Sequence, residues 1–289
     1  MKVGVCVMYN SISEMEEKFQ ALRAEGFDNC QIVAWRPAEW TDENATIIND
    51  LLKKYDIEIS AFWCGWGDGD INVWNFYEGP TTLGLLPPEY REGRIKDLCN
   101  GADFAKKLGV KNVATHMGFI PENPNDPEFL PFCDAVRVVA EHLQKNGQNL
   151  LFETGQETPV AMMRCFEVVG TDNLGVNLDT ANLILYGKAN PVDALDVFGH
   201  KVMNLHAKDG KYPVNGHDLG EEVSIGMGKV DFYGVISKLH ELGYDGYVTI
   251  EREVSNGKEM EDDERTKDIR FAKQYLENII RKVCGGATC

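Results

Sequence analysis

The chain alternates between short apolar runs and longer amphipathic runs, and this alternation restricts the fold more than any other feature. The apolar runs are rich in Val and Ile and lack a strict two-residue period. Such runs are typical of strands that are buried on both faces of a parallel sheet. We expect strands at residues 3–8, 30–35, 57–64, 112–116, 149–153, 175–179, 202–206 and 247–251.

The amphipathic runs predict one helix after each strand. Gly26, Gly109 and Gly243 follow three of these runs, where a helix C-cap requires a left-handed residue. Eight strand–helix repeats in 289 residues indicate a single-domain (β/α)8 TIM barrel spanning residues 1–289. We expect the helices at residues 14–25, 45–55, 90–108, 128–145, 160–168, 191–198, 232–242 and 263–282.

An open doubly wound sheet is the alternative arrangement for such repeats. That fold usually carries a glycine-rich nucleotide loop after the first strand, whereas residues 9–13 here read YNSIS. The barrel is therefore favoured. Two long segments, 65–88 and 209–229, follow the third and seventh strands, at the barrel end where active sites are built.

Charge and cysteine content exclude several classes of partner. The chain has 46 acidic and 29 basic residues, and a formal net charge of −17 opposes binding to nucleic acid or to anionic membranes. We expect no signal peptide, because the first residues, MKVGVCVMYN, read as a short strand, and no apolar run approaches the ~20 residues of a membrane span. Eight cysteines without a CxxC pair predict reduced thiols in a cytoplasmic protein, and the final GGATC predicts a frayed tail.

Four consecutive predicted strands end in side chains that bind metals. Glu153, Asp179, His206 and Glu251 each follow an apolar run and would meet at the rim of the barrel. Three carboxylates and an imidazole repel one another in a partly buried site unless a cation is present. The pattern thus predicts one divalent ion, with Mn²⁺ preferred and Mg²⁺, Co²⁺ or Zn²⁺ as alternatives. Taken singly, Asp179 is equally typical of a helix N-cap, and His206 of a hydrogen-bonded core histidine.

Nearly the whole chain resembles the xylose-isomerase-like barrels of the sugar phosphate isomerase/epimerase superfamily. This resemblance implies that Glu153, Asp179, His206 and Glu251 hold one divalent metal, and that the two glutamates act as acid and base in ketose 3-epimerases. Asn182 stands where those epimerases have a histidine, and Lys208 and Tyr212 stand where they have an arginine, a pattern closer to inosose dehydratases. The resemblance rests on Glu153, D-x-x-N at 179–182, H-x-K-D at 206–209, GxGxVDF at 226–232 and E-x-E at 251–253.

The expected activity is isomerisation or epimerisation of a keto sugar through an enediolate that the ion stabilises, with Glu153 and Glu251 moving the proton. The alternative is a lyase that dehydrates a keto-inositol or eliminates from a 3-keto glycoside on the same site. An apurinic endonuclease would need several more histidines at strand ends and a less acidic chain. A non-enzymatic binding module is a further alternative, which the four metal-type residues oppose.

Further residues are candidates for contacting a small carbohydrate substrate. Each also has an ordinary structural interpretation, such as a core aromatic ring or a solvated loop charge. No phosphate-binding glycine loop is evident, which favours an unphosphorylated sugar, and the long loops offer an interface for a homo-oligomer. The substrate candidates are His116, Trp63, Asn182, Lys208, Gln156 and His217.

Overall fold

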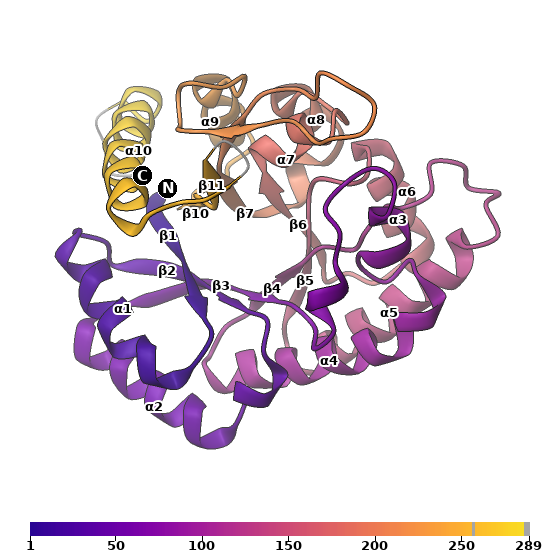
Figure 1. Ribbon diagram of the computed structural model, residues 1–289, viewed down its shortest axis with the longest axis horizontal. Helices are drawn as coiled ribbons and strands as arrows, with labels where there is room; N and C mark the ends of the chain where they lie inside the picture. The colour runs from indigo at the N-terminus through magenta and orange to yellow at the C-terminus, as the bar shows by residue number, and fades with distance from the viewer. Residues whose placement is uncertain (256–257, 286–289) are drawn as a thin grey trace.

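The computed structural model describes residues 1–255 and 258–285, and it contains a closed barrel of eight parallel strands (Figure 1). Most of the GGATC tail lies outside the described residues. Around the barrel the strands follow the order β1, β10, β7, β6, β5, β4, β3 and β2. Their bounds are β1 Lys2–Tyr9, β2 Asn29–Ala34, β3 Glu58–Cys64, β4 Asn112–Thr115, β5 Asn149–Glu153, β6 Leu174–Asp179, β7 Val202–Ala207 and β10 Tyr247–Ile250.

The predicted (β/α)8 barrel is confirmed. All six residues of β2 and of β6 are buried, as expected for strands covered on both faces. The fourth and eighth strands end one residue earlier than predicted, at Thr115 and Ile250. His116 and Glu251 therefore begin the loops at the carboxyl end of the barrel.

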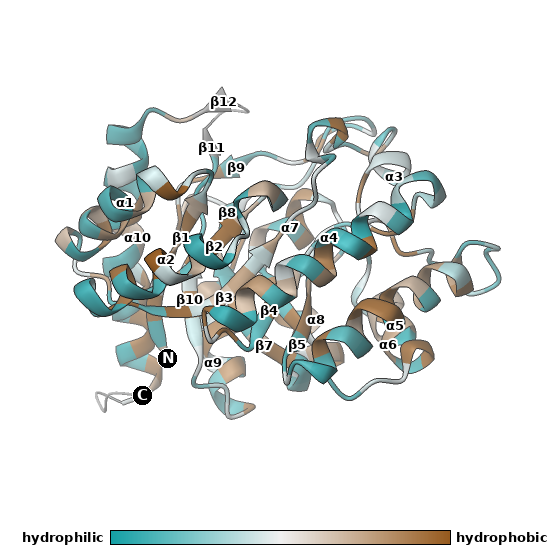
Figure 2. Ribbon diagram, turned by 90° about the horizontal axis from the view of Figure 1, so that it is seen from below, coloured by the Kyte–Doolittle hydropathy of each residue, from teal (hydrophilic) through white to brown (hydrophobic). Residues whose placement is uncertain are grey.

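Helices surround the strands, and teal and brown residues alternate along them as amphipathic packing requires (Figure 2). Thr41 and Thr158 cap two of them through side-chain hydrogen bonds to backbone N–H groups. The helices that follow the strands are α1 Ile12–Ala24, α2 Asp42–Tyr55, α4 Pro88–Lys107, α5 Phe129–Lys145, α6 Pro159–Val169, α8 Pro191–Phe198, α9 Phe232–Glu241 and α10 Asp262–Val283.

Shorter helices and strands, which were not predicted from the sequence, lie within the loops. They are α3 Gly79–Thr82, α7 Thr180–Leu185, the 3₁₀ turns Pro37–Glu39, Gly69–Ile71 and Gly199–Lys201, and the paired strands β8 Asp209–Gly210 with β9 Glu222–Val223 and β11 Val254–Ser255 with β12 Lys258–Glu259. The α7 turn begins directly after Asp179, so β6 leads into a helix without a loop.

Asp209 fixes the segment that follows the seventh barrel strand. Its buried carboxylate accepts four backbone hydrogen bonds: Oδ1 from Gly210 and Val230, and Oδ2 from Gly226 and Gly228, at 2.8 to 3.1 Å. A Cβ on Gly228 would lie 2.1 Å from Oδ1 of Asp209, so only glycine fits there. The aspartate of H-x-K-D thus holds the GxGxVDF segment and sets the position of the loop between them.

Six of the cysteines are reduced, as predicted. Cys6, Cys30, Cys64, Cys99, Cys133 and Cys165 are free thiols. Cys284 is disulfide-bonded, so the prediction of a fully reduced chain is wrong at this residue. Within the described residues, no helix is both long and apolar enough to cross a bilayer.

Candidate metal centre and substrate pocket

Four buried side chains from adjacent strands converge at the carboxyl end of the barrel. Glu153 ends β5, Asp179 ends β6, His206 lies in β7, and Glu251 follows β10. Asp179 and His206 are direct partners in the β6–β7 register. One donor atom from each of the four lies within 4.8 Å of the others, so the cluster could hold a metal ion.

The imidazole of His206 stands at the centre of this cluster. Its Nδ1 lies 3.2 Å from Oε1 of Glu153, 3.3 Å from Oε2 of Glu251 and 3.8 Å from Oδ2 of Asp179. Neighbouring ligands of an octahedral ion with bonds of ~2.1 Å are roughly 3 Å apart. The donor atoms are therefore spaced almost as an ion would require.

Gln31 sets the orientation of the His206 ring. Oε1 of Gln31 lies 2.8 Å from Nε2 of His206, and the same oxygen accepts a hydrogen bond from Nδ2 of Asn204. An acceptor at Nε2 keeps the proton on that nitrogen, which leaves Nδ1 with a free lone pair toward the carboxylates. This is the tautomer that binds a metal through Nδ1.

The two carboxylate oxygens of Asp179 have different surroundings, and one of them makes the N-cap contact that the sequence suggested. Its Oδ1 accepts a hydrogen bond of 2.7 Å from the backbone N–H of Asn182 and caps α7. Its Oδ2 is buried and has no hydrogen-bond partner among the described residues, as is also true of Nδ1 of His206. Two unpaired buried atoms that face each other are costly without a cation, so these residues fit a divalent ion.

The acidic residues of the cluster differ in the direction of their pKa shifts. Burial raises the pKa of Asp179 to about 7, although Lys208 opposes the shift. Burial acts in the same direction on Glu251, but Lys208 and His206 outweigh it and hold the pKa of Glu251 well below its usual range. Lys208 therefore favours an ionised carboxylate at Glu251.

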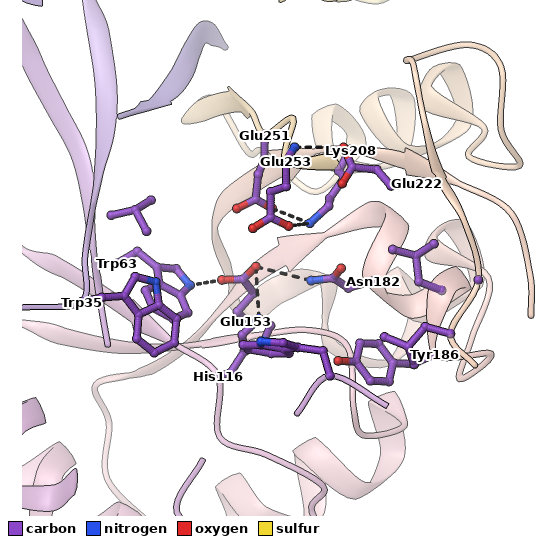
Figure 3. A pocket seen from close by; sticks show the side chains of 15 residues that line it. Trp35, Trp63, His116, Glu153, Asn182, Tyr186, Lys208, Glu222, Glu251 and Glu253 are labelled. Carbon is purple, nitrogen blue, oxygen red and sulfur yellow. Dashed lines mark hydrogen bonds and ion pairs between the residues drawn. The ribbon is translucent and has the colours of Figure 1, made fainter. Parts of the chain in front are cut away.

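Glu153 is surrounded by candidate substrate residues (Figure 3). Trp63 donates its indole N–H to Oε2 of Glu153. On the other oxygen, Oε1, Nδ2 of Asn182 lies 3.5 Å away and Nε2 of His116 3.7 Å away. These contacts hold the carboxylate in one orientation beside the cluster.

Lys208 holds the carboxylate of Glu251, as Trp63 holds that of Glu153. Its buried ammonium lies 3.1 Å from Oε2 of Glu251, contacts Oε2 of Glu253, and lies 3.9 Å from Oδ2 of Asp179. Figure 3 shows this charged group across from Trp35 and Trp63. The site thus has one charged wall and one aromatic wall.

These walls enclose a cavity of about 320 Å³, the lower end of the range for small-molecule sites. Among its lining residues, Trp35 and Trp63 pack 4.7 Å apart, and Trp74 contacts His116 at 5.2 Å between ring centroids. The lining residues include the candidates Trp63, His116, Glu153, Asn182, Lys208 and Glu251.

Two predicted substrate residues lie outside this lining. Gln156 is buried behind the pocket and donates a 3.2 Å hydrogen bond to the hydroxyl of Tyr186, which itself lines the cavity. His217 is exposed and stacks on Tyr77, with ring centroids 5.1 Å apart. This stack joins the loop after β3 to the loop after β7.

Sequence reasoning missed several residues of the site. Gln31 could have been noticed, because it is a polar residue within the apolar run 30–35. Trp74, Tyr186 and Leu219 gave no such signal, since they lie in loops, and Tyr186 directly follows the unpredicted α7.

A family model described as xylose isomerase-like TIM barrel matches residues 19–278. The chain belongs to this family. An uncharacterized protein of Methanocaldococcus jannaschii is 26% identical over 98% of this chain and 92% of its own length. Inosose dehydratase of Geobacillus kaustophilus is also 26% identical, but the match covers 55% of this chain and 54% of the dehydratase.

Solved structures superpose over nearly the full chain. A xylose isomerase domain protein from Planctomyces limnophilus has a TM-score of 0.88 and 28% identity, covering 98% of this chain and 99% of its own. An L-ribulose 3-epimerase has a TM-score of 0.71, covers 99% of this chain and 96% of its own, and shares 19% identity, a likeness of fold alone. The chain is thus similar in fold to an epimerase and in part of its sequence to a dehydratase.

Proposed function

We propose that this protein is a divalent-metal-dependent isomerase or epimerase of a keto sugar. The observation that carries the proposal is the convergence of Glu153 and Glu251 on Nδ1 of His206, with each carboxylate held by a different pocket residue. Epimerisation at a carbon next to a carbonyl needs two such groups, one on each face of the carbon.

The four residues Glu153, Asp179, His206 and Glu251 would hold the ion. Three oxygen donors and one nitrogen suit Mn²⁺ best, with Mg²⁺, Co²⁺ and Zn²⁺ as alternatives. When bound, the ion would polarise the sugar carbonyl and acidify the neighbouring C–H group.

The protein's own residues would carry the proton. One of the carboxylates, Glu153 or Glu251, would take it from carbon, and the other would return a proton after gaining one. Trp63 would keep Glu153 oriented, and Lys208 would do the same for Glu251. His116 and Asn182, which line the cavity, would contact sugar oxygens, and Trp35 or Trp63 would cover an apolar ring face.

The charge of the lining supports a neutral sugar. Glu153, Glu222, Glu251 and Glu253 line the cavity, and Lys208 is the sole lysine or arginine among the described lining residues. Because Lys208 already pairs with Glu251 and Glu253, a phosphate group would find no free cation. We therefore propose an unphosphorylated substrate, and further propose that the chain acts as one cytoplasmic domain that forms a homo-oligomer.

A lyase is the second candidate. It is supported by the likeness to inosose dehydratase and by the lysine beside Glu251. In that reaction one of the two carboxylates removes the C–H proton, the C–O bond of a β-hydroxyl breaks, and a proton delivered to the hydroxyl completes a water molecule. The substrate would be a keto-inositol, or a 3-keto glycoside that loses its aglycone instead.

Incubation of the Mn²⁺-loaded protein with ketoses and keto-inositols in D₂O tests the proposal. Proton NMR should show deuterium entering beside the carbonyl, with a stereoisomer or positional isomer as product. Loss of water would identify the lyase. Absence of deuterium from every substrate, in a preparation that binds Mn²⁺, would contradict both.

A further inference from the structure

A thiol lies beside the candidate metal centre. Sγ of Cys6, on β1, is 3.9 Å from Nε2 of His206, the nitrogen that faces away from the carboxylates. Cys6 is partly exposed and packs against the cluster that contains Val33 and Trp63, which both line the pocket. Cys6 therefore lies next to the pocket lining.

We propose that Cys6, His206 and Glu251 form an alternative site for a thiophilic divalent ion such as Cd²⁺ or Zn²⁺. Their donor atoms lie within 4.8 Å of one another. In a tetrahedral zinc site with Zn–S of ~2.3 Å and Zn–N of ~2.0 Å, sulfur and nitrogen are about 3.6 Å apart. The observed separation is 3.9 Å, and an ion bound to Nε2 would displace Oε1 of Gln31 from this nitrogen.

The two metal sites exclude each other because both use His206 and Glu251. An ion that prefers oxygen takes Glu153 and Asp179 as its other ligands, whereas a thiophilic ion takes Cys6. Binding at the alternative site forms metal–sulfur and metal–Nε2 bonds, releases the thiol proton to solvent and moves the imidazole proton from Nε2 to Nδ1, with no change in oxidation state. This inference depends on the proposed function in one respect only: the thiophilic ion and the catalytic ion compete for His206 and Glu251.

Near-ultraviolet absorption tests the site directly. Cd²⁺ or Co²⁺ added to the purified protein should produce a thiolate-to-metal charge-transfer band at one equivalent per chain. Cys6→Ser should abolish the band and weaken Cd²⁺ binding at least ~10-fold. The matched control is Cys99→Ser, a partly exposed cysteine on α4 outside the cluster, which should retain both.

Glu153→Gln separates this inference from the proposed function. It should keep the thiolate band, because Glu153 is not a ligand of the alternative site, while losing Mn²⁺ affinity. A band in Cys6→Ser equal to that of wild type would overturn the inference, as would Cd²⁺ binding to wild type without a band. Failure of wild type to bind Mn²⁺ with the band intact would overturn the proposed function alone. Circular dichroism shows whether Cys6→Ser is folded, and Cys6→Ala is a second variant that lacks the thiol.

Discussion

Oε1 of Gln31 lies 2.8 Å from Nε2 of His206, on the side of the ring opposite the three carboxylates. This contact fixes the tautomer and points Nδ1 into the cluster. Such supporting contacts typically contribute a factor of ~10–100 to metal affinity.

Gln31→Ala should therefore weaken Mn²⁺ binding by a factor of about 10–100, measured by titration calorimetry. Gln31→Glu keeps an acceptor at the same place and should restore most of the affinity. Equal affinities of Gln31→Ala and wild type would show that Gln31 does not position the ring.

Trp63→Phe should lower kcat/KM on the substrate identified by proton exchange, with Mn²⁺ affinity nearly unchanged. The indole N–H is the donor to Oε2 of Glu153, and a hydrogen bond to a charged group is worth about 1.5–3 kcal/mol, or roughly 10–100-fold in rate. A variant as active as wild type would exclude this positioning role.

Asp209→Ala should destabilise the fold by about 3 kcal/mol, because four backbone N–H groups lose their shared acceptor. Urea denaturation measures the change. Asp218→Asn, in an exposed loop, is the control and should stay within about 0.5 kcal/mol of wild type. A loss equally small for Asp209→Ala would contradict the role assigned to this carboxylate.

Glu157 should make stability fall as pH rises. Its side chain is fully buried, and burial raises the pKa to about 8, above the value of about 4.3 in an unfolded chain. Between these two pH values the folded state keeps the carboxyl proton, whereas the unfolded state releases it. The free energy of unfolding therefore falls as pH rises toward 8. The slope reaches at most about 1.4 kcal/mol per pH unit.

Glu157→Gln is the test of that pH dependence. The free energy of unfolding of the variant, relative to wild type, should increase from pH 5 to pH 8.5, since the amide stays neutral. Glu141→Gln, at an exposed position on α5, should show a flat difference. A flat difference for Glu157→Gln as well would mean that Glu157 is not held neutral in the fold.

The barrel and the cluster could be predicted because both depend on local patterns. Eight apolar runs determine the strands, and polar residues at their ends, such as Glu153 and His206, must meet once the barrel closes. The loops could not be predicted in this way. His217 has the chemistry of a substrate ligand, yet its position depends on Tyr77, about 140 residues earlier in the chain. The same limit applies to Gln156, whose side chain donates to Tyr186, a lining residue that directly follows the unpredicted α7.

The metal content of the purified protein tests the central claim most directly. Mass spectrometry of wild type and Glu153→Gln, each dialysed against Mn²⁺ and then against metal-free buffer, should find about one divalent ion per wild-type chain and much less in the variant. A wild-type protein that retains no ion and shows no affinity for added Mn²⁺ would contradict the account.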